Sequence, residues 1–265
     1  MHRIIVCVKA VPEPKAAGEL KIDPVTKSLP RLDIPLEINP LDRNALEVAL
    51  LIKEQSAAHI TVISMGPPSA GDVVKECLAL GADTGILLSD PAFAGADAFA
   101  TAYTLAKAIE RLEPIDVVLC GTASSDGATE WVGPELSTFL NLPVVTMVRE
   151  IVDPESQTWK VKADIENGYR LVQVELPALF TVTRDVNTPR TLSFSGIIKS
   201  RKKEITTWGL EDLPVSEELV GLKGSPTIVS DLAPLEGGRE CEIITGTPEE
   251  KADILITKLA EAGVI

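Results

Sequence analysis

Histidine, aromatic residues and paired cysteines are scarce in this sequence. Its 265 residues include two histidines and four cysteines, and aromatic residues make up 4%. His2 lies at the start of the chain and His59 precedes an apolar run, so neither a zinc site nor a His-based catalytic triad is easily assembled. The cysteines show no C-x-x-C spacing. We expect Cys7 and Cys120, which end apolar runs, to be buried thiols, and we predict no metal site.

Positive charge and long apolar runs are lacking as well. Acidic residues outnumber basic ones by 39 to 25, which gives a net charge of −14. Such a balance repels phosphate backbones and argues against a nucleic-acid partner. No apolar run approaches the roughly 18–20 residues of a membrane span, and the N-terminus has no signal-peptide pattern. We therefore expect a cytoplasmic protein without membrane insertion.

What the sequence has instead, through residue 150, is short apolar runs alternating with helical patterns. Continuous β-branched runs of this length are typical of strands buried on both faces of a parallel sheet. They lie at residues 4–8, 60–64, 85–88, 115–120 and 144–147. The helical patterns cover residues 44–53, 71–80, 98–112 and 130–140. Asp42 is a plausible N-cap of the first helix and Gly81 a C′ residue of the second. The alternation predicts an α/β fold with a doubly wound, mostly parallel sheet.

Two regions depart from this alternation. Residues 13–40 are too irregular for a crossover helix and carry strand-like pieces at 20–22 and 28–29. After residue 150, segments 158–165 and 169–175 predict a hairpin around Asn167 and Gly168, a type I′ signal, followed by a strand at 179–184. The acidic, proline-rich segment 211–224 and an amphipathic helix at 249–262 close the chain. We predict an α/β domain over residues 1–184, with the hairpin region at about 150–176, and an extended C-terminal arm over 185–265.

The strongest local signal is residues 121–133 (GTASSDGATEWVG), between a buried strand and a helix. Unpaired N–H groups and the helix dipole at such a turn can hold a phosphate or pyrophosphate. Gly127 would let the backbone approach the phosphate, while Ser124 and Thr129 add hydroxyl donors. The alternative is that these polar residues only cap the helix. The sequence fits neither the P-loop nor the standard dinucleotide fingerprint.

Three further turns follow strands and should lie at the same carboxyl edge of the sheet. In residues 39–42 (NPLD), Asn39 can donate and accept at an adenine or ribose, although a capped turn explains the segment equally well. Residues 64–68 (SMGPP) carry a glycine that could pass close to a flat ring. Residues 89–97 (SDPAFAGAD) leave room for a second ligand, and Asp97 could accept from ribose hydroxyls; a loop capped by Asp97 is the alternative.

The basic stretch 199–203 (KSRKK) can be a solvated face, or in a chain of this charge it can engage an acidic partner or a phosphate. No spacing resembles a Ser/His/Asp triad or a pair of catalytic carboxylates. The sequence therefore predicts no catalytic residue.

Along essentially its whole length the chain resembles the β subunit of electron transfer flavoproteins. The likeness is carried by residues 4–9 (IIVCVK), 39–42, 64–68, 124–129 with Val132 and Gly133, and the block from Thr183-Arg184 through Pro189-Arg190 to 195–199 and 202–203. The resemblance implies a heterodimer with an α subunit that carries its own FAD. In the ordinary branch the β subunit holds AMP, and in the bifurcating branch it holds FAD beside NAD(H).

Residues 65–68 (MGPP), Asp90 with 92–97 (AFAGAD), and 126–129 (DGAT) are more similar to the bifurcating branch. That branch implies that NADH reduces the β-subunit FAD. One electron then passes to a low-potential acceptor such as ferredoxin or flavodoxin, and the other passes through the α-subunit FAD to a flavin-containing dehydrogenase. Where similar members usually show Ala-Gln, this chain has Glu130-Trp131.

Carried onto this sequence, the resemblance implies three groups of site residues. The cofactor-binding group is Cys7, Lys9, Asn39, Asp42, Met65, Gly66, Ser124, Asp126, Gly127, Ala128, Thr129, Val132 and Gly133. The NAD-binding group is Asp90, Phe93, Ala94, Gly95 and Asp97. The partner-recognition group is Asp185, Val186, Asn187, Thr188, Pro189 and Arg190, with the terminal helix packing on the α subunit.

Two alternatives remain open at this point. The first is a non-bifurcating carrier subunit that binds AMP and does not react with NADH. The second, from another functional class, is a nucleotide-sensing α/β module. The long tail after residue 180 and the block at 183–203 argue against the sensing module.

Overall fold

The computed structural model describes residues 1–13, 35–154, 157–229 and 241–265. The strand-like pieces expected at 20–22 and 28–29 lie outside these residues. The chain forms two compact units, Met1–Ser230 and Asp231–Ile265. In the described ranges, no helix combines the length and the apolar character that crossing a membrane requires.

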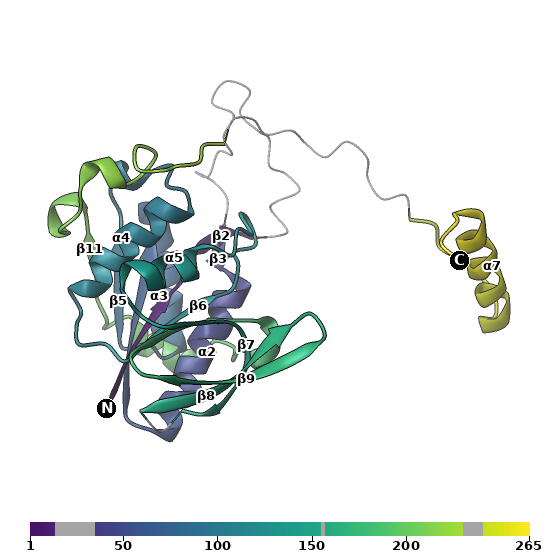
Figure 1. Cartoon of the computed structure of the whole chain (residues 1–265), viewed down its shortest axis with the longest axis horizontal. Coiled ribbons are helices and arrows are strands. Elements are labelled where there is room, and N and C mark those ends of the chain that lie inside the picture. The colour runs from purple at the N-terminus through teal and green to yellow at the C-terminus, as the bar shows by residue number, and fades with distance from the viewer. Residues whose placement is uncertain (14–34, 155–156, 230–240) are drawn as a thin grey trace. The chain divides into compact units, whose positions relative to one another are not determined.

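The first unit is built on one large sheet (Figure 1). Its nine strands follow the order β11-β5-β4-β1-β6-β10-β7-β8-β9. Every neighbouring pair from β11 to β7 is parallel, whereas β7, β8 and β9 are antiparallel. The strands are β1 His2–Cys7, β4 Ala58–Met65, β5 Thr84–Leu88, β6 Val117–Gly121, β7 Val144–Asp153, β8 Thr158–Ile165, β9 Gly168–Glu175, β10 Ala178–Val182 and β11 Ile205–Trp208. The predicted α/β class with a mostly parallel sheet is confirmed.

Helices pack on both faces of the parallel strands. Ile4 and Val6 of β1 join a core cluster with α2 and α3, while Ile5 and Cys7 point the other way, into a cluster with α4 and α5. Because the residues on both faces of the strand are buried, consecutive residues are all apolar. This explains the continuous apolar run in the sequence. The helices of this unit are α2 Pro40–Gln55, α3 Gly71–Leu80, α4 Ala98–Glu110, α5 Val132–Phe139 and α6 Phe194–Ser200. A short antiparallel pair, β2 Ala10–Pro12 and β3 Leu36–Ile38, stands apart from the main sheet.

The strand order reverses beside β1. The chain runs from β1 to β4 and β5 on one side, and then returns to place β6 against the opposite edge of β1. The connections that leave β1 and β6 therefore diverge at the carboxyl edge of the sheet. In open α/β sheets, ligands bind in the crevice at such a reversal.

Two local expectations are wrong in detail. Helix α2 begins at Pro40 with Asn39 as its N-cap, so Asp42 lies within the first turn and is not the cap. The hairpin turn is not type I′, because Glu166 and Asn167 are not in the left-handed region and only Gly168, which opens β9, has a positive φ of 142°.

The start of α5 also differs from the prediction. The helix begins at Val132 and not at Glu130. Ala128 and Glu130 have φ values of +47° and +62°, which a right-handed helix cannot include. The loop after β6 is therefore longer than the apolar pattern indicates, and it lies over the carboxyl ends of the neighbouring strands.

The compact first unit runs to Ser230 and so includes residues on both sides of residue 184, where the sequence analysis divides the chain. Strand β11 pairs with β5, with Trp208 opposite Leu88, and so forms the edge of the main sheet. Helix α6 packs closely on α3: a Cβ at Gly196 would lie 2.2 Å from the carbonyl oxygen of Ala79. These elements are short, so their place in the first unit depends on tertiary contacts that local patterns do not reveal. The second unit holds α7, Pro248–Glu261, close to the helix expected at 249–262.

Trp159 joins the β8–β9 hairpin to the sheet. Its ring is fully buried and stacks on Phe180 of β10, with 5.2 Å between the ring centroids. We expect Trp159→Ala to lower the free energy of unfolding by about 3–5 kcal/mol, because the truncation leaves a large cavity. Tyr169→Ala on the exposed side of β9 should cost less than about 1 kcal/mol. Urea unfolding followed by circular dichroism measures both, and equal losses would contradict this role for Trp159.

Candidate functional site

The carboxylate of Asp42 connects the two strands at which the sheet order reverses. Its Oδ2 accepts a hydrogen bond from the backbone N–H of Lys9, directly after β1, at 2.8 Å. Its Oδ1 accepts one from the N–H of Gly121, the last residue of β6, also at 2.8 Å. Asp42 is buried, and burial, opposed by these two hydrogen bonds, raises its pKa to about 6. Its two backbone hydrogen bonds thus join the connections that leave β1 and β6.

Asn39 holds the loop that follows β6. Its side-chain Nδ2 donates to the carbonyl of Ala123 at 2.9 Å, and its Oδ1 accepts from the N–H of Ser125 at 3.0 Å. The backbone N–H of Asn39 donates to the carbonyl of Lys9. Both ends of the amide therefore position the loop. Contact of Asn39 with an adenine or ribose stays a prediction.

The loop itself carries a cation and an open glycine. Lys9 Nζ lies 2.6 Å from Asp126 Oδ1 and 3.3 Å from Ser124 Oγ, which also accepts from the N–H of Gly127. A Cβ at Gly127 would approach nothing closer than Ser124 Oγ at 3.5 Å, so the backbone there is accessible. The N–H groups of the first turn of α5 have no intrahelical partner and lie at the positive end of its dipole. The arrangement can accept a phosphate.

Gly133 brings α5 onto the sheet. A Cβ at this position would lie 2.4 Å from Thr181 Cγ2 and 3.2 Å from Cys120 Sγ. The absence of a side chain thus lets the helix start lie against β6 and β10. For the two neighbouring predicted residues, the structure gives Thr129 an exposed place in the loop and Val132 the first position of the helix.

Cys7, Met65 and Gly66 lie at the carboxyl ends of β1 and β4, on the same edge of the sheet. Cys7 and Cys120 are buried free thiols, as predicted. Burial, together with the negative charge of Asp42, raises the pKa of Cys7 to about 12. Cys7 is therefore a protonated thiol at neutral pH and not a nucleophile. Gly66 donates its N–H to the carbonyl of Leu88.

Beside the loop lies a cavity of about 530 Å³ that the sequence did not indicate. It is bounded by the start of α5, by the carboxyl ends of β6 and β10, and by the first half of β7. Its lining includes Thr122, Trp131, Glu135, Met147 and Thr181. A bulge in β7 shapes the wall, where Met147 has φ of +59° and donates its N–H to Thr181 Oγ1. Because β10 inserts between β6 and β7, these residues come together only in the folded sheet.

The predicted NAD-binding loop contacts a later segment of the chain. Asp97 caps α4, and its Oδ2 accepts hydrogen bonds from both the N–H and the Oγ1 of Thr227. Leu222 donates its N–H to the carbonyl of Ala94, and its Cβ would lie 3.0 Å from a Cβ at Gly95. Desolvation raises the pKa of Asp97, but the hydrogen bonds from Thr227 and Ala100 outweigh it, so the pKa lies below its usual value.

Asp90, at the start of the same loop, is engaged in a similar way. Its carboxylate accepts from the N–H groups of Leu210 and Ala92, which hold its pKa below the usual value. Phe93 is buried among residues of α4. The structure thus brings the loop together with residues 210–227 and not with the Lys9 and Asn39 contacts. Its role in binding NAD(H) stays a prediction.

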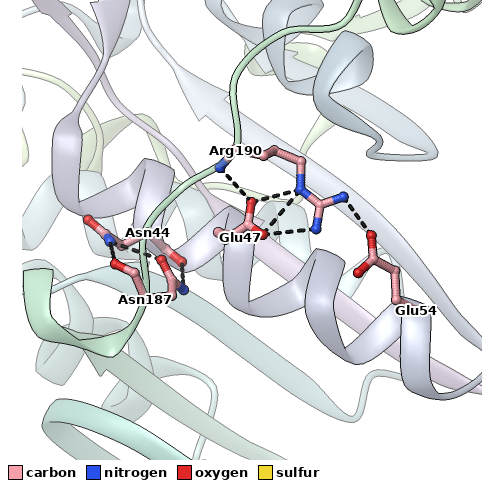
Figure 2. A network of polar contacts seen from close by, with 5 residues as sticks. All are labelled: Asn44, Glu47, Glu54, Asn187 and Arg190. Atoms are coloured by element: carbon pink, nitrogen blue, oxygen red, sulfur yellow. Dashed lines mark hydrogen bonds and ion pairs between the residues drawn. The ribbon is translucent and has the colours of Figure 1, made fainter.

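The predicted partner-recognition segment is fastened to α2 (Figure 2). Asn187 and Asn44 exchange hydrogen bonds, with Asn44 Nδ2 donating to Asn187 Oδ1 and Asn187 Nδ2 donating to the carbonyl of Asn44, both at 3.0 Å. Arg190 forms a fork on buried Glu47, with Nε 2.8 Å from Oε2 and Nη2 2.9 Å from Oε1, and Nη1 reaches Glu54 at 2.7 Å. Hydrogen bonds from Arg190 to Glu47 raise the pKa of the guanidinium.

The remaining members of that segment lie differently. Asp185 and Thr188 are exposed, Pro189 is half-buried and Val186 packs against the core. The side chains of Asn187 and Arg190 therefore fix the segment, and exposed positions such as Asp185 and Thr188 remain for a partner. Recognition by this segment stays a prediction.

The basic stretch 199–203, which begins in the last turn of α6, is partly structural. Lys203 Nζ donates to the carbonyl of Ala82, and Lys75 Nζ donates to the carbonyl of Lys203. Burial lowers the pKa of Lys203. Arg201 and Lys202 are exposed. An acidic partner for the exposed part of the stretch stays a prediction.

Comparison with known proteins supplies a family context. The profile of the electron transfer flavoprotein domain matches residues 29–213. The caffeyl-CoA reductase-Etf complex subunit CarD of Acetobacterium woodii is 43% identical over 267 residues, covering 99% of this chain and 100% of that protein. The electron transfer flavoprotein subunit beta of Clostridium acetobutylicum is 42% identical, covering 97% and 98%. The acryloyl-CoA reductase electron transfer subunit gamma of Anaerotignum propionicum is 36% identical, covering 99% and 100%.

Glu47 and Glu54 offer a matched pair of variants for the Arg190 fork. We expect Glu47→Ala to lower the free energy of unfolding by about 1–3 kcal/mol, because it leaves a partly buried guanidinium without its main acceptor. Glu54→Ala should cost less than about 1 kcal/mol, since Glu54 is 58% exposed. Urea unfolding measures both, and hydrogen exchange should increase at residues 187–190 in Glu47→Ala alone.

The raised pKa of Asp42 predicts a pH dependence of stability. Between about pH 4 and pH 6 the folded protein keeps a proton on Asp42 that the unfolded chain has lost, so stability falls as pH rises through this window. We expect the wild type to lose about 2–3 kcal/mol more than Asp42→Asn between pH 4 and pH 7. Urea unfolding at several pH values checks this. Parallel curves for the two proteins would contradict it.

Proposed function

The chain belongs to the electron transfer flavoprotein family as a β-type subunit, and from this premise we propose that it is the β subunit of an electron-bifurcating member, binding FAD and meeting NAD(H). The observation that supports this proposal is the cavity of about 530 Å³ directly beside the loop after β6, to which we assign phosphate binding. A subunit that held only AMP would need space for one adenosine and one phosphate. The added space favours a dinucleotide, and the bifurcating features of residues 65–68, 90–97 and 126–129 point the same way.

The residues present fit FAD. Reversal of the strand order at β1, with the ligand at the carboxyl edge, is the arrangement of Rossmann-like nucleotide-binding folds. Backbone at Gly127, the hydroxyls of Ser124 and Thr129, and the start of α5 would hold the diphosphate, and Lys9 would offset part of its charge. Bound there, FAD would supply hydride and one-electron chemistry. The chain's own part is to bind and orient it, with Asn39 and Asp42 fixing the loop.

The partners that we propose rest on the family and on the second unit of the chain. Helix α7 has no buried residue in the described chain, yet Ala252, Leu255, Ile256 and Leu259 recur at helical spacing. We assign this face, with the C-terminal arm, to an α subunit that carries a second FAD. Because relatives are named for caffeyl-CoA and acryloyl-CoA reductases, we assign the dehydrogenase partner to the same class of flavin enzyme. Ferredoxin or flavodoxin is the proposed low-potential acceptor.

Gly127 tests the diphosphate site. We expect Gly127→Asp in the complex of both subunits to lose the β-site nucleotide, because a carboxylate would repel the diphosphate. Gly127→Ala is the matched control: its Cβ has no neighbour closer than 3.5 Å, so the nucleotide should stay. The measurement is FAD and AMP per complex after purification, together with bleaching of the flavin by NADH. A wild type with one flavin and one AMP per complex, not bleached by NADH, would reject the proposal in favour of an ordinary carrier.

A further inference from the structure

The loop at residues 90–97 has few side chains of its own that could fix its conformation. Apart from Phe93, residues 92–96 are alanine or glycine. Gly95 has φ of +74°, a conformation that glycine adopts readily and other residues rarely do. A segment of this composition loses much conformational entropy when it is ordered, so it needs contacts from elsewhere in the chain to hold one conformation.

A later segment, residues 220–227, which we call the strap, forms hydrogen bonds with Asp97 at the end of this loop. Thr227 donates to Asp97 Oδ2 from its backbone N–H at 2.9 Å and from its Oγ1 at 2.7 Å. Ser225 Oγ accepts from the backbone N–H of Asp97 at 2.8 Å. Asp97 Oδ1 accepts from the N–H of Ala100 in the first turn of α4 at 3.1 Å. Both carboxylate oxygens are thus engaged within the chain, and Oδ2 is engaged by the strap.

The strap also packs on the small residues in the middle of the loop. Leu222 donates its N–H to the carbonyl of Ala94 at 2.9 Å, and its Cβ lies 3.0 Å from the place that a Cβ at Gly95 would take. Gly221 has φ of +57°, and a Cβ there would lie 2.0 Å from the carbonyl oxygen of Ala92. The absence of a side chain at Gly221 therefore lets the backbones of strap and loop lie in direct contact.

The strap has its own attachment to the first unit. Val220 is 2% exposed and belongs to the core cluster that includes residues of α4. Just before the strap, Ser216 donates its N–H to the hydroxyl of Tyr103 at 3.1 Å, and the guanidinium of Arg111 donates to the carbonyl of Asp212. The strap is therefore held on α4 independently of its contacts with the loop, and it can act as a fixed support for the loop.

We propose that the strap positions the loop at residues 90–97 for NAD(H), with Thr227 as a positioning residue that acts through Asp97. The inference rests on the proposed function, in which this loop meets NAD(H). Asp97 then connects the start of α4 to the strap, and it is not an acceptor for ribose hydroxyls. Loss of the Thr227 hydroxyl loosens the loop and weakens NADH binding, but it leaves FAD and the chemistry of reduction unchanged.

The test measures bleaching of the flavin at several NADH concentrations in the complex of both subunits. We expect Thr227→Val, which keeps the branched shape and the backbone N–H but loses one hydrogen bond, to raise the half-saturating NADH concentration about 5-fold. The limiting rate and the FAD per complex should stay within about twofold. Thr227→Ser keeps the hydroxyl and should restore the wild-type value. Thr206→Val, at an exposed position of the edge strand β11, is the matched control and should change neither quantity.

A double-mutant cycle tests the role of Asp97. Asp97→Asn keeps a good N-cap for α4 but removes the carboxylate oxygen that Thr227 uses. If Asp97 acts through Thr227, the double variant should bind NADH no more weakly than Asp97→Asn alone. Additive losses would overturn the proposal, because they would show that Asp97 contacts NAD(H) independently of the strap.

Hydrogen exchange gives a readout that does not depend on NADH. Exchange at residues 92–97 should increase in Thr227→Val, and it should not increase in Thr227→Ser or Thr206→Val. If NADH bleaches the wild type and Thr227→Val keeps the wild-type half-saturating concentration or the wild-type exchange, the positioning role is refuted while the proposed function stands. If NADH does not bleach the wild type, the proposed function fails, and the role of the strap in NAD(H) binding fails with it.

Discussion

The site depends on one interaction: a buried carboxylate that accepts two backbone N–H groups from different strands. Asp42 connects Lys9 after β1 with Gly121 at the end of β6, each at 2.8 Å. At this point the sheet order reverses, so no continuing strand ladder would hold the two connections at a fixed separation. The hydrogen bonds offset part of the cost of burying a charge. The crevice depends on this contact, and beside it Asn39 holds the loop after β6 and Gly133 lets α5 start against the sheet.

Most of the sheet could be predicted from the sequence, because a strand buried on both faces leaves a short continuous apolar run bounded by turn residues. The strands around β1 and the helices α3 and α4 lie close to their expected positions. Strand β11 (ITTW) could not be found, since an edge strand of four residues has too few apolar positions to show alternation. Helix α2 starts early because Pro40 at its first position is a helix-start signal that the apolar spacing does not include.

For the candidate site, too, local sequence predicts one part and long-range contacts determine the rest. The loop at 124–129 could be recognised locally, since small and polar residues between a strand and a helix mark the turn itself. The cavity beside it could not, because β10 follows β7 in the chain yet lies between β6 and β7 in the sheet. Likewise, Asp97 looked available to a ligand, but its carboxylate is engaged by Thr227, 130 residues later. Contacts of that sequence separation leave no trace in local composition.

The charge of the chain limits how the loop after β6 could hold a phosphate. The chain carries a net charge of −14, and Lys9, the cation at the loop, already pairs with Asp126 at 2.6 Å. A diphosphate in such surroundings is held mainly by backbone N–H groups and the helix dipole, which add no net charge and which AMP and FAD can use alike. Discrimination must then come from the half of the ligand that AMP lacks.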